Sequence, residues 1–461
     1  MKKLLGSTLA LALIVPATAN AELLKNFKMG GSLEVDAVSA TNVKDLATVK
    51  YDDISTIQTR LMVKADWDLL DDVHAHVSLD KNDRTWGGTA AGNTAGGTSQ
   101  NLNGIESTVW VDESYVKIDK LFGALDTTVG RQFYGESGDL VIYFGPKYNL
   151  YGMPITALDA ARFDWNGEKA GVTILGGKVK SAGLGATDTA DVNLYGLDVH
   201  AKPMDNVSGS AYIYNRNTIN SGTGALNVVA NDHLYVAGLK GKVTAGIAWL
   251  KAEVAKDFGQ NRTVPGTGGS VYGTVANYTG WAGKLDLGAK VDLSSLGAVT
   301  GWGEAGIGSG GATGNRNFQA IAGDYRPGQI WGRFLTSAAA TFAGGAAGQG
   351  NGADNTTLSD LVVLGAGAKI TPAALSKLTA GLSWWNYRLQ TSNGVPTGRS
   401  GNRALGNEYD LDLSWAHSEN VLVSAGVGEF QPGGNLIRAG IASNGTISSA
   451  RLGYADLSVK F

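Results

Sequence analysis

The stretch RLGYADLSVKF, residues 451–461, decides the fold because its side chains alternate between two kinds. The odd-numbered residues from 453 onward are small or apolar: Gly453, Ala455, Leu457, Val459 and Phe461. The even-numbered residues are mostly polar: Tyr454, Asp456, Ser458 and Lys460. Successive side chains of a β-strand point to opposite faces, so the stretch predicts a strand with one apolar and one polar face. Such a strand, ending on an aromatic residue, has to be built into a larger sheet.

The same two-residue alternation recurs along the chain. Residues 56–69 alternate apolar with polar or charged side chains, and residues 73–80 repeat the pattern after a turn at 70–72. Later examples lie at residues 281–292 and 408–415. A secreted sandwich of two packed sheets has similar strands one by one, but it rarely sustains them over about 18 strands of one chain. The pattern therefore favours strands with lipid on one face and water on the other.

Breaks between the predicted strands are alternately short and long. Short breaks are predicted near residues 119–122, 166–168, 203–206, 240–241, 294–296, 372–375 and 418–419, and long ones near 84–105, 135–157, 181–190, 217–230, 258–279, 338–357, 391–403 and 431–448. Short turns at one end and long loops at the other are typical of a transmembrane barrel, which pairs all its backbone groups without leaving an edge.

We therefore predict an all-β fold, a single transmembrane antiparallel up-and-down β-barrel over residues 22–461. The strand count is about 18, within a range of about 16–20, because residues 315–337 read either as a strand pair or as part of a longer loop. Barrels of this size leave an aqueous channel.

The N-terminus predicts export. Residues 1–21 have the parts of a cleaved signal peptide: Lys2 and Lys3, an apolar run over 4–15 and a small-residue cleavage site at 19–21. The formal net charge of −3 over 461 residues gives no reason to expect nucleic acid as a partner. The absence of Cys excludes disulfides and thiolate chemistry. Sixteen Tyr and 11 Trp are spread along the length, as aromatic girdles at two membrane interfaces require.

Two passages resemble the alginate-export family of outer-membrane barrels. The first is residues 123–165, with Gly130-Arg131-Gln132, Tyr134-Gly135, Gly145-Pro146 and LDAARFDW at 158–165; the second is residues 406–434. The resemblance implies an 18-stranded monomer in a Gram-negative type of outer membrane, reached through the periplasm, which passes a polyanionic polysaccharide or smaller anion by passive diffusion. The terminal stretch resembles the last strand of outer-membrane barrels, which implies contact with the barrel-assembly machinery through the strand ending at Phe461.

Candidate pore-lining residues combine both charges. Arg131 and Arg162 flank the loop 135–157, where they either line a constriction or are bridged as wall-stabilising pairs by Asp164 or Glu113. The other candidates share the predicted lumen parity: Arg60, Lys64, Asp164, Lys284, Lys290, Glu408, Asp410 and Asp412. A lumen of mixed charge leaves the choice between anions and cations open.

The remaining polar patterns are weaker. Glu408, Asp410 and Asp412 form a ladder that either guides cations or is a solvated lumen face neutralised by Lys or Arg. His74-x-His76 offers two metal ligands without a third, so neither a metal nor another cofactor is predicted.

No catalytic motif occurs, and no enzyme is predicted. The favoured function is a channel for a hydrophilic solute. The alternatives are a plugged structural or adhesive barrel and, less favoured, an outer-membrane hydrolase. We expect loop 135–157 to fold partly inward because its aromatic residues need burial, and loop 338–357 to remain at the surface.

Overall fold

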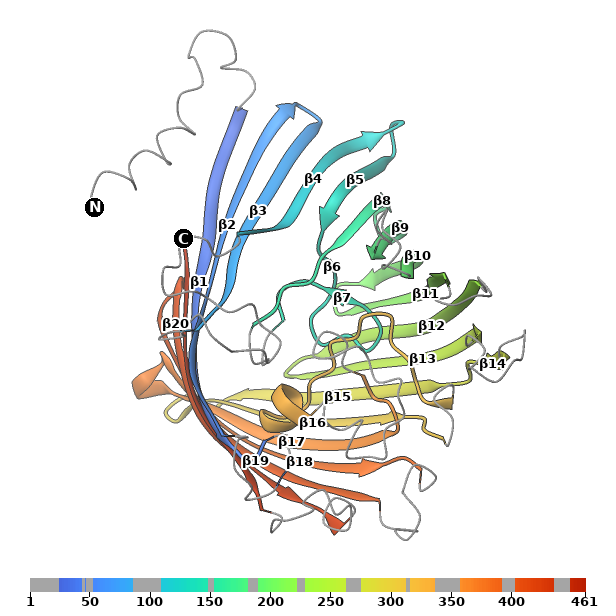
Figure 1. Cartoon of the computed structure of the whole chain (residues 1–461). Helices are drawn as coiled ribbons and strands as arrows, with labels where there is room; N and C mark the ends of the chain where they lie inside the picture. Colours follow the sequence, from blue (N-terminus) through green and yellow to red (C-terminus); the bar gives the residue numbers. More distant parts are fainter. Residues whose placement is uncertain are drawn as a thin grey trace.

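The computed structural model describes residues 25–43, 46, 53–85, 109–147, 153–180, 190–221, 229–262, 275–311, 316–335, 357–391, 403–434 and 448–461. These residues form a closed antiparallel barrel of 18 strands (Figure 1). The predicted signal peptide lies outside the described residues, as do residues 86–108 and 336–356 of the long loops.

Each strand of the wall pairs with the next one along the chain. The strands are β1 (Lys25–Thr41), β2 (Ile54–Leu70), β3 (Val73–Thr85), β4 (Trp110–Leu121), β5 (Leu125–Gln132), β8 (Leu158–Asn166), β9 (Ala170–Lys180), β10 (Ala190–Met204), β11 (Val207–Ser221), β12 (Val229–Ala245), β13 (Ala248–Arg262), β15 (Trp281–Asp292), β16 (Gly297–Gly308), β17 (Leu361–Pro372), β18 (Leu378–Leu389), β19 (Ala404–Ser418), β20 (Val421–Pro432) and β21 (Ala450–Lys460). The short β14 (Val275–Asn277) pairs with the end of β13 beyond the reach of β15, so it extends the wall without adding a position to it.

The barrel closes where β21 pairs with β1. Leu33 lies opposite Val459 in this ladder. Beyond it, Gly31 N donates to Phe461 O at 2.8 Å and Phe461 N donates to Gly31 O at 3.0 Å. The other edge of β21 pairs with β20, so the described sheet has no open edge there. The prediction that residues 451–461 form a strand built into a larger wall is confirmed.

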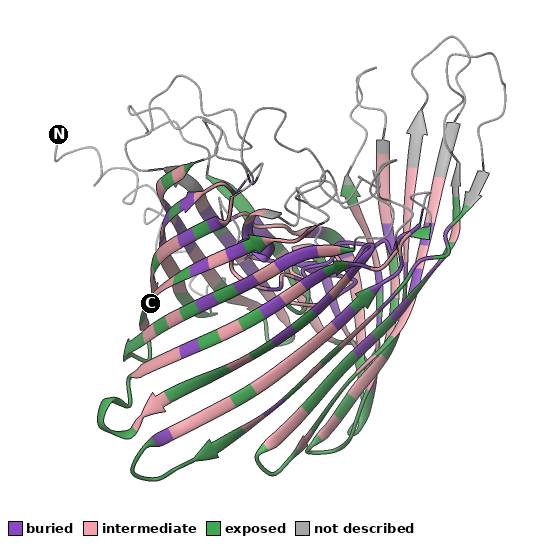
Figure 2. Ribbon diagram, turned by 90° about the horizontal axis from the view of Figure 1, so that it is seen from below, coloured by how far each residue is buried: buried purple, intermediate pink, exposed green. Residues whose placement is uncertain are grey.

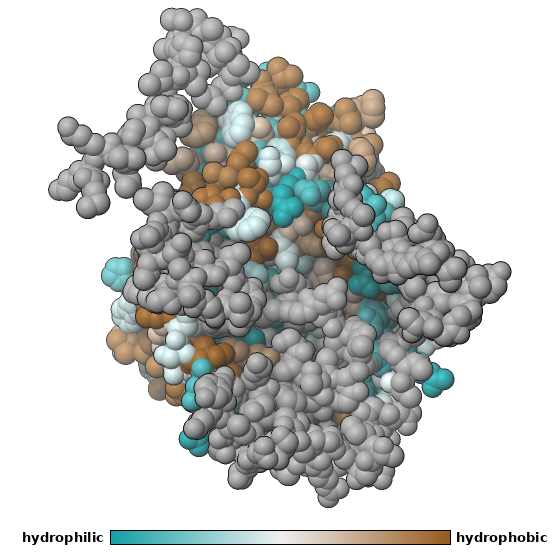
Figure 3. Space-filling model, viewed as in Figure 1, coloured by the Kyte–Doolittle hydropathy of each residue, from teal (hydrophilic) through white to brown (hydrophobic). Residues whose placement is uncertain are grey.

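The two faces of the wall differ as the alternation predicts. On β15, Leu285 and Leu287 are exposed on the outer face, whereas Lys284 and Asp286 line the lumen. Apolar side chains gather along the outer edge of the barrel in Figure 3. Figure 2 shows that the short-turn ends are mostly exposed, while buried positions lie nearer the long-loop end. Contacts inside the lumen therefore bury the inward face in that part of the barrel.

One expectation about the turns is wrong, and one reading that was left open is decided. The break predicted at Lys240-Gly241 is part of β12, which continues to Ala245, and the turn lies at residues 246–247. The cause is that Lys240 and Lys242 face the lumen, where a charged row resembles a polar break. Residues 316–335 form no strand pair but enter the barrel, which settles the count at 18. Within the described ranges no helix has the length and apolarity to cross a membrane.

Candidate functional site

Two parts of the chain fold into the barrel from its long-loop end (Figure 1). The inner loop, residues 133–147 and 153–157, joins β5 to β8 and contains β6 (Tyr134–Gly135) and β7 (Tyr143–Phe144). The inner segment, residues 309–311 and 316–335, follows β16 and ends in the π-helical turn η2 (Trp331–Leu335). The predicted partial inward fold of loop 135–157 is confirmed for its described residues, 135–147 and 153–157, and β7 is buried. The inward course of residues 316–335 was not predicted.

Backbone hydrogen bonds join the inner loop to the inner segment. Tyr143 N donates to Ala322 O at 2.8 Å, and both Ile321 N and Ala322 N donate to Val141 O at 3.0 and 2.9 Å. Ile142 and Ala322 form a parallel β-bridge, and the apolar side chains around it belong to one buried cluster. The two parts therefore act as one body inside the lumen.

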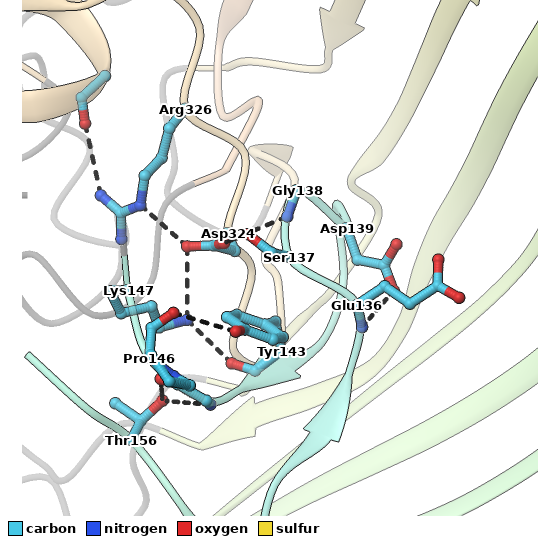
Figure 4. A network of polar contacts seen from close by, with 12 residues as sticks. Glu136, Ser137, Gly138, Asp139, Tyr143, Pro146, Lys147, Thr156, Asp324 and Arg326 are labelled. Carbon is cyan, nitrogen blue, oxygen red and sulfur yellow. Dashed lines mark hydrogen bonds and ion pairs between the residues drawn. The ribbon is translucent and has the colours of Figure 1, made fainter. Parts of the chain in front are cut away.

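Asp324 of the inner segment is the polar centre of this junction (Figure 4). Its buried carboxylate accepts hydrogen bonds from Ser137 Oγ at 2.9 Å and from Gly138 N at 3.2 Å, both in the inner loop. Arg326 Nε donates to it at 2.9 Å, and Lys147 Nζ lies 3.6 Å away. Because Lys147 is fully buried, Asp324 is a principal source of compensation for its charge.

Carboxylates on the barrel wall hold both parts in place. Glu253 on β13 accepts from Leu140 N at 3.1 Å, and Asp257 on the same strand accepts from Gln319 N at 2.7 Å. Glu408 on β19 accepts from the backbone N–H groups of residues 330 and 331 at 2.6 and 3.0 Å. All three wall side chains are buried. They satisfy backbone donors that would otherwise be buried without a partner.

Trp331 and Arg333 fix the end of the inner segment. The Trp331 ring stacks on Tyr387 of β18, with centroids 4.4 Å apart. Arg333 donates to both carboxylate oxygens of Asp36 on β1 at 3.1 and 3.2 Å. The inner segment is thereby anchored to strands on both sides of the barrel closure.

A polar cavity of about 850 Å³ remains between the inner loop and strands β8 to β15. Six Lys or Arg side chains and six carboxylates line it: Arg162, Lys202, Lys240, Lys242, Lys251 and Lys284, with Glu136, Asp139, Asp164, Asp198, Glu253 and Asp286. Several pair with each other, including Lys240 with Asp139 at 2.9 Å and Arg162 with Asp164 at 2.7 Å. Burial raises the pKa of Asp139 to about 6, and the neighbouring Lys240 charge opposes that rise.

Several predicted site residues lie in the lumen. Arg162, Asp164 and Lys284 line the large cavity. Asp410 and Asp412 line a second cavity, of about 170 Å³, beside residues 326–329. Lys64 lies 3.7 Å from Glu113 and stands over the ring of Phe133. Lys290 shares the lumen parity of β15 near its short turn.

The prediction that Arg131 lines the pore is wrong, whereas Arg162 lines the large cavity and pairs with Asp164, as one of the two readings predicts. Arg131 pairs in register with Ser114 and Asp159, whereas Arg162 lies opposite Thr128, so the two arginines occupy opposite faces of the wall. Arg131 is on the outer face, where it donates to Val111 O at 2.9 Å and lies 3.4 Å from Asp159. The sequence does contain a signal for this: Arg131 lies two residues after the apolar Val129, so the two side chains share the outward face of the strand.

Arg60 and the carboxylate ladder have structural roles. The Arg60 guanidinium is buried, pairs with Glu34 and donates to the backbone carbonyls of Lys147 and Met153 in the inner loop. Glu408 and Asp410 are buried, so the reading of the ladder as a solvated face is wrong for them. They are covered because the inner segment packs against this part of the wall.

The two histidines each contact carboxylates. His74 Nδ1 lies 2.6 Å from Asp68, and His76 Nδ1 lies 2.6 Å from Asp66. Within the described ranges no group of three or more His, Asp or Glu side chains is arranged to hold a metal ion.

Asp324, Glu253 and Asp257 were missed from the sequence. For Asp324 the available signal was the apolar and aromatic content of NFQAIAGDYRPGQIWGRF, residues 317–334, which is unusual for an exposed loop.

No protein-family profile and no curated protein matches the sequence. Solved structures match over nearly the whole chain. OccAB2 of Acinetobacter baumannii has a TM-score of 0.55 at 8% identity, over 95% of this chain and 98% of that chain. OpdQ of Pseudomonas aeruginosa has a TM-score of 0.53 at 10% identity, over 96% of this chain and 99% of that chain. The outer membrane protein opdK of the same organism has a TM-score of 0.53 at 8% identity, over 94% of this chain and 99% of that chain. Sequence identity this low supports a statement about the fold alone: the chain shares the closed 18-stranded barrel fold of these solved outer-membrane proteins.

Proposed function

We propose that this protein is an outer-membrane channel through which small hydrophilic solutes diffuse passively. The observation that carries the proposal is the polar cavity of about 850 Å³ inside a closed 18-stranded wall. Charged side chains of both signs keep such a cavity hydrated, and barrels of this size enclose aqueous channels. The outer-membrane proteins that share the fold support the same placement.

The joined inner loop and inner segment are the filter of the proposed channel. They lie inside the ring of strands and are held by backbone bonds and by buried wall carboxylates. A body fixed in this way narrows the lumen to a constant shape. This favours small solutes over a long polysaccharide, so we propose small-solute diffusion ahead of alginate export.

The mixed lining predicts weak charge selectivity. Six basic and six acidic side chains line the large cavity, and several are paired, either within one strand or between a strand and the inner loop. We propose no catalytic role. We further propose that the barrel works as a monomer and that its short turns face the periplasm, the arrangement general to outer-membrane barrels.

Liposome swelling tests the proposed function. Purified barrel is reconstituted into liposomes, which are then diluted into isotonic solutions of neutral sugars of increasing size. We expect fast swelling with the smallest sugars and a steep fall with size, because the filter has a fixed shape. Liposomes containing the protein that swell no faster than empty ones, while gel mobility shows a folded barrel, would favour a plugged structural barrel.

A further inference from the structure

Three tryptophan side chains face the lumen from β13, β16 and β18. Trp302 and Trp385 line the smaller cavity beside residues 326–329. Trp249 lies two residues before Lys251, which lines the large cavity, so both share the inward face of β13. The three are the second, sixth and eighth residues of strands that begin at short turns. They therefore climb from the short-turn end of the lumen toward the inner segment.

The Trp249 ring reaches the strand that carries Trp302. A Cβ added to Gly288 of β15 would overlap the Trp249 ring, so this ring covers position 288. Gly288 lies opposite Trp302 in the ladder between β15 and β16, and paired strands are about 4.8 Å apart. The indole of Trp249 therefore ends beside Trp302. Both side chains are partly exposed, so a molecule in the lumen can reach them.

Trp302 and Trp385 meet over β17. They come from the strands on either side of it, and a Cβ added to Gly367 or Gly365 of β17 would overlap their rings. The two ring centroids are 5.2 Å apart, and the ring planes are inclined by 47°. Together the three rings form an aromatic track (Trp249, Trp302 and Trp385) that ends at the smaller cavity.

The polar groups around this cavity are balanced in charge. Arg326 and Lys369 line it together with Asp410 and Asp412. Gln329 Nε2 donates to Asp412 Oδ1 at 3.3 Å. Gln329 Oε1 is shielded from solvent and has no hydrogen-bond partner within the described part of the chain. An amide oxygen in this state is a preformed acceptor for a donor on a bound molecule.

We propose that the aromatic track and the smaller cavity bind a neutral pyranose sugar on its way through the lumen. The faces of a pyranose ring carry C–H groups of slight positive charge, which the negative face of an indole attracts. Its rim carries hydroxyl groups, which can donate to Gln329 Oε1 and accept from the exposed Lys369 ammonium. The inference rests on the proposed channel function and names a solute class for it.

Size and charge favour a sugar over an ion or a small amino acid. The cavity of about 170 Å³ has the volume of roughly six water molecules, which leaves room for a single small ring. Its two basic and two acidic side chains offset each other, so neither a cation nor an anion is favoured over a neutral molecule. A small amino acid has both charges but no ring face to set against the indoles.

Block of the single-channel current in planar bilayers tests the site. The probes are glucose, its open-chain counterpart sorbitol, which has no ring face, and the zwitterion serine. We expect glucose to halve the wild-type current at a concentration about tenfold below that of sorbitol, as one aromatic stacking contact would produce. Trp302→Ala should remove this preference, and Trp302→Phe, which keeps a ring, should retain most of it.

Matched variants separate stacking from pore width. Trp384→Ala is the control, because Trp384 is the neighbour of Trp385 in sequence but is exposed on the outer face of the wall. A wider pore weakens the block by glucose and by sorbitol alike, so the ratio of the two blocking concentrations reports stacking alone. Trp249→Ala, at the short-turn end of the track, should lower that ratio as well.

Two results would overturn the sugar site. One is the same ratio in Trp302→Ala, Trp249→Ala and Trp384→Ala, and the other is block by serine at lower concentrations than by glucose. In both cases the current measured without solute still supports the proposed channel. Folded, inserted protein that carries no current contradicts the channel itself, and the sugar site with it.

Discussion

Replacing Asp324 with Ala tests whether the joined inner loop and inner segment set the size of the pore. The substitution removes the carboxylate that accepts from Ser137 Oγ and Gly138 N, and with it a partner of Lys147 and Arg326. The wall ladders do not involve Asp324, so the barrel should still close. The change acts on the junction inside the lumen.

The magnitude follows from burial. Removing one partner of a buried ion pair costs about 3–5 kcal/mol, because the remaining charge loses its compensation in a medium of low polarity. At about 1.4 kcal/mol per tenfold change, the equilibrium for detaching the inner loop from the inner segment shifts by roughly two to three and a half powers of ten. A junction that opens rarely in the wild type should then open often in Asp324→Ala.

Planar-bilayer recording is the assay. We expect Asp324→Ala to show larger and noisier single-channel currents than the wild type. Asp324→Asn, which keeps one acceptor oxygen but loses the charge, should be intermediate. Glu136→Gln is the control, because it removes a carboxylate that lines the large cavity but does not join the inner loop to the inner segment. Currents of wild-type size and noise from folded Asp324→Ala would refute the filter role of this junction.

Three further predictions concern anchoring, pH and assembly. Glu408→Ala leaves two buried backbone N–H groups without their acceptor, at about 1–3 kcal/mol each, and bilayer recordings should show enlarged, fluctuating currents; wild-type currents would contradict the anchoring. Burial raises the pKa of Asp139 to about 6, so acidification through that value neutralises Asp139 and leaves the Lys240 charge less compensated. Reversal potentials in a KCl gradient should then shift toward anions, and Asp139→Asn should abolish the shift. Deleting Phe461 removes two closing hydrogen bonds, about 1–3 kcal/mol in total, and should lower the yield of folded barrel on gels without altering the conductance of inserted molecules.

The wall was predictable because strand alternation is local. In residues 281–292 the polarity of each side chain predicts the face of the strand on which it lies. The structure agrees: Lys284 lines the lumen and Leu285 is on the outer face. Alternation also gives the right face for Arg131, which shares the parity of the outward Val129. The prediction was wrong there because a charged side chain was assumed to face the water of the lumen.

The inside of the barrel was only partly predictable because its contacts join distant parts of the chain. Asp324 contacts Ser137 and Lys147, which lie far from it in the sequence. Arg333 likewise contacts Asp36, near the other end of the chain. Nothing local distinguishes a carboxylate that accepts buried backbone donors, such as Glu408, from one that faces water. Aromatic content indicated the inward fold of the inner loop, and the same reasoning applies to the inner segment.

The single-channel current of the wild-type protein in planar bilayers tests the proposed channel most directly. We expect discrete insertion steps, a current that scales with salt concentration, and partial block by small hydrophilic solutes. Folded, inserted protein that carries no current would contradict the claim that a water-filled path remains beside the joined inner loop and inner segment.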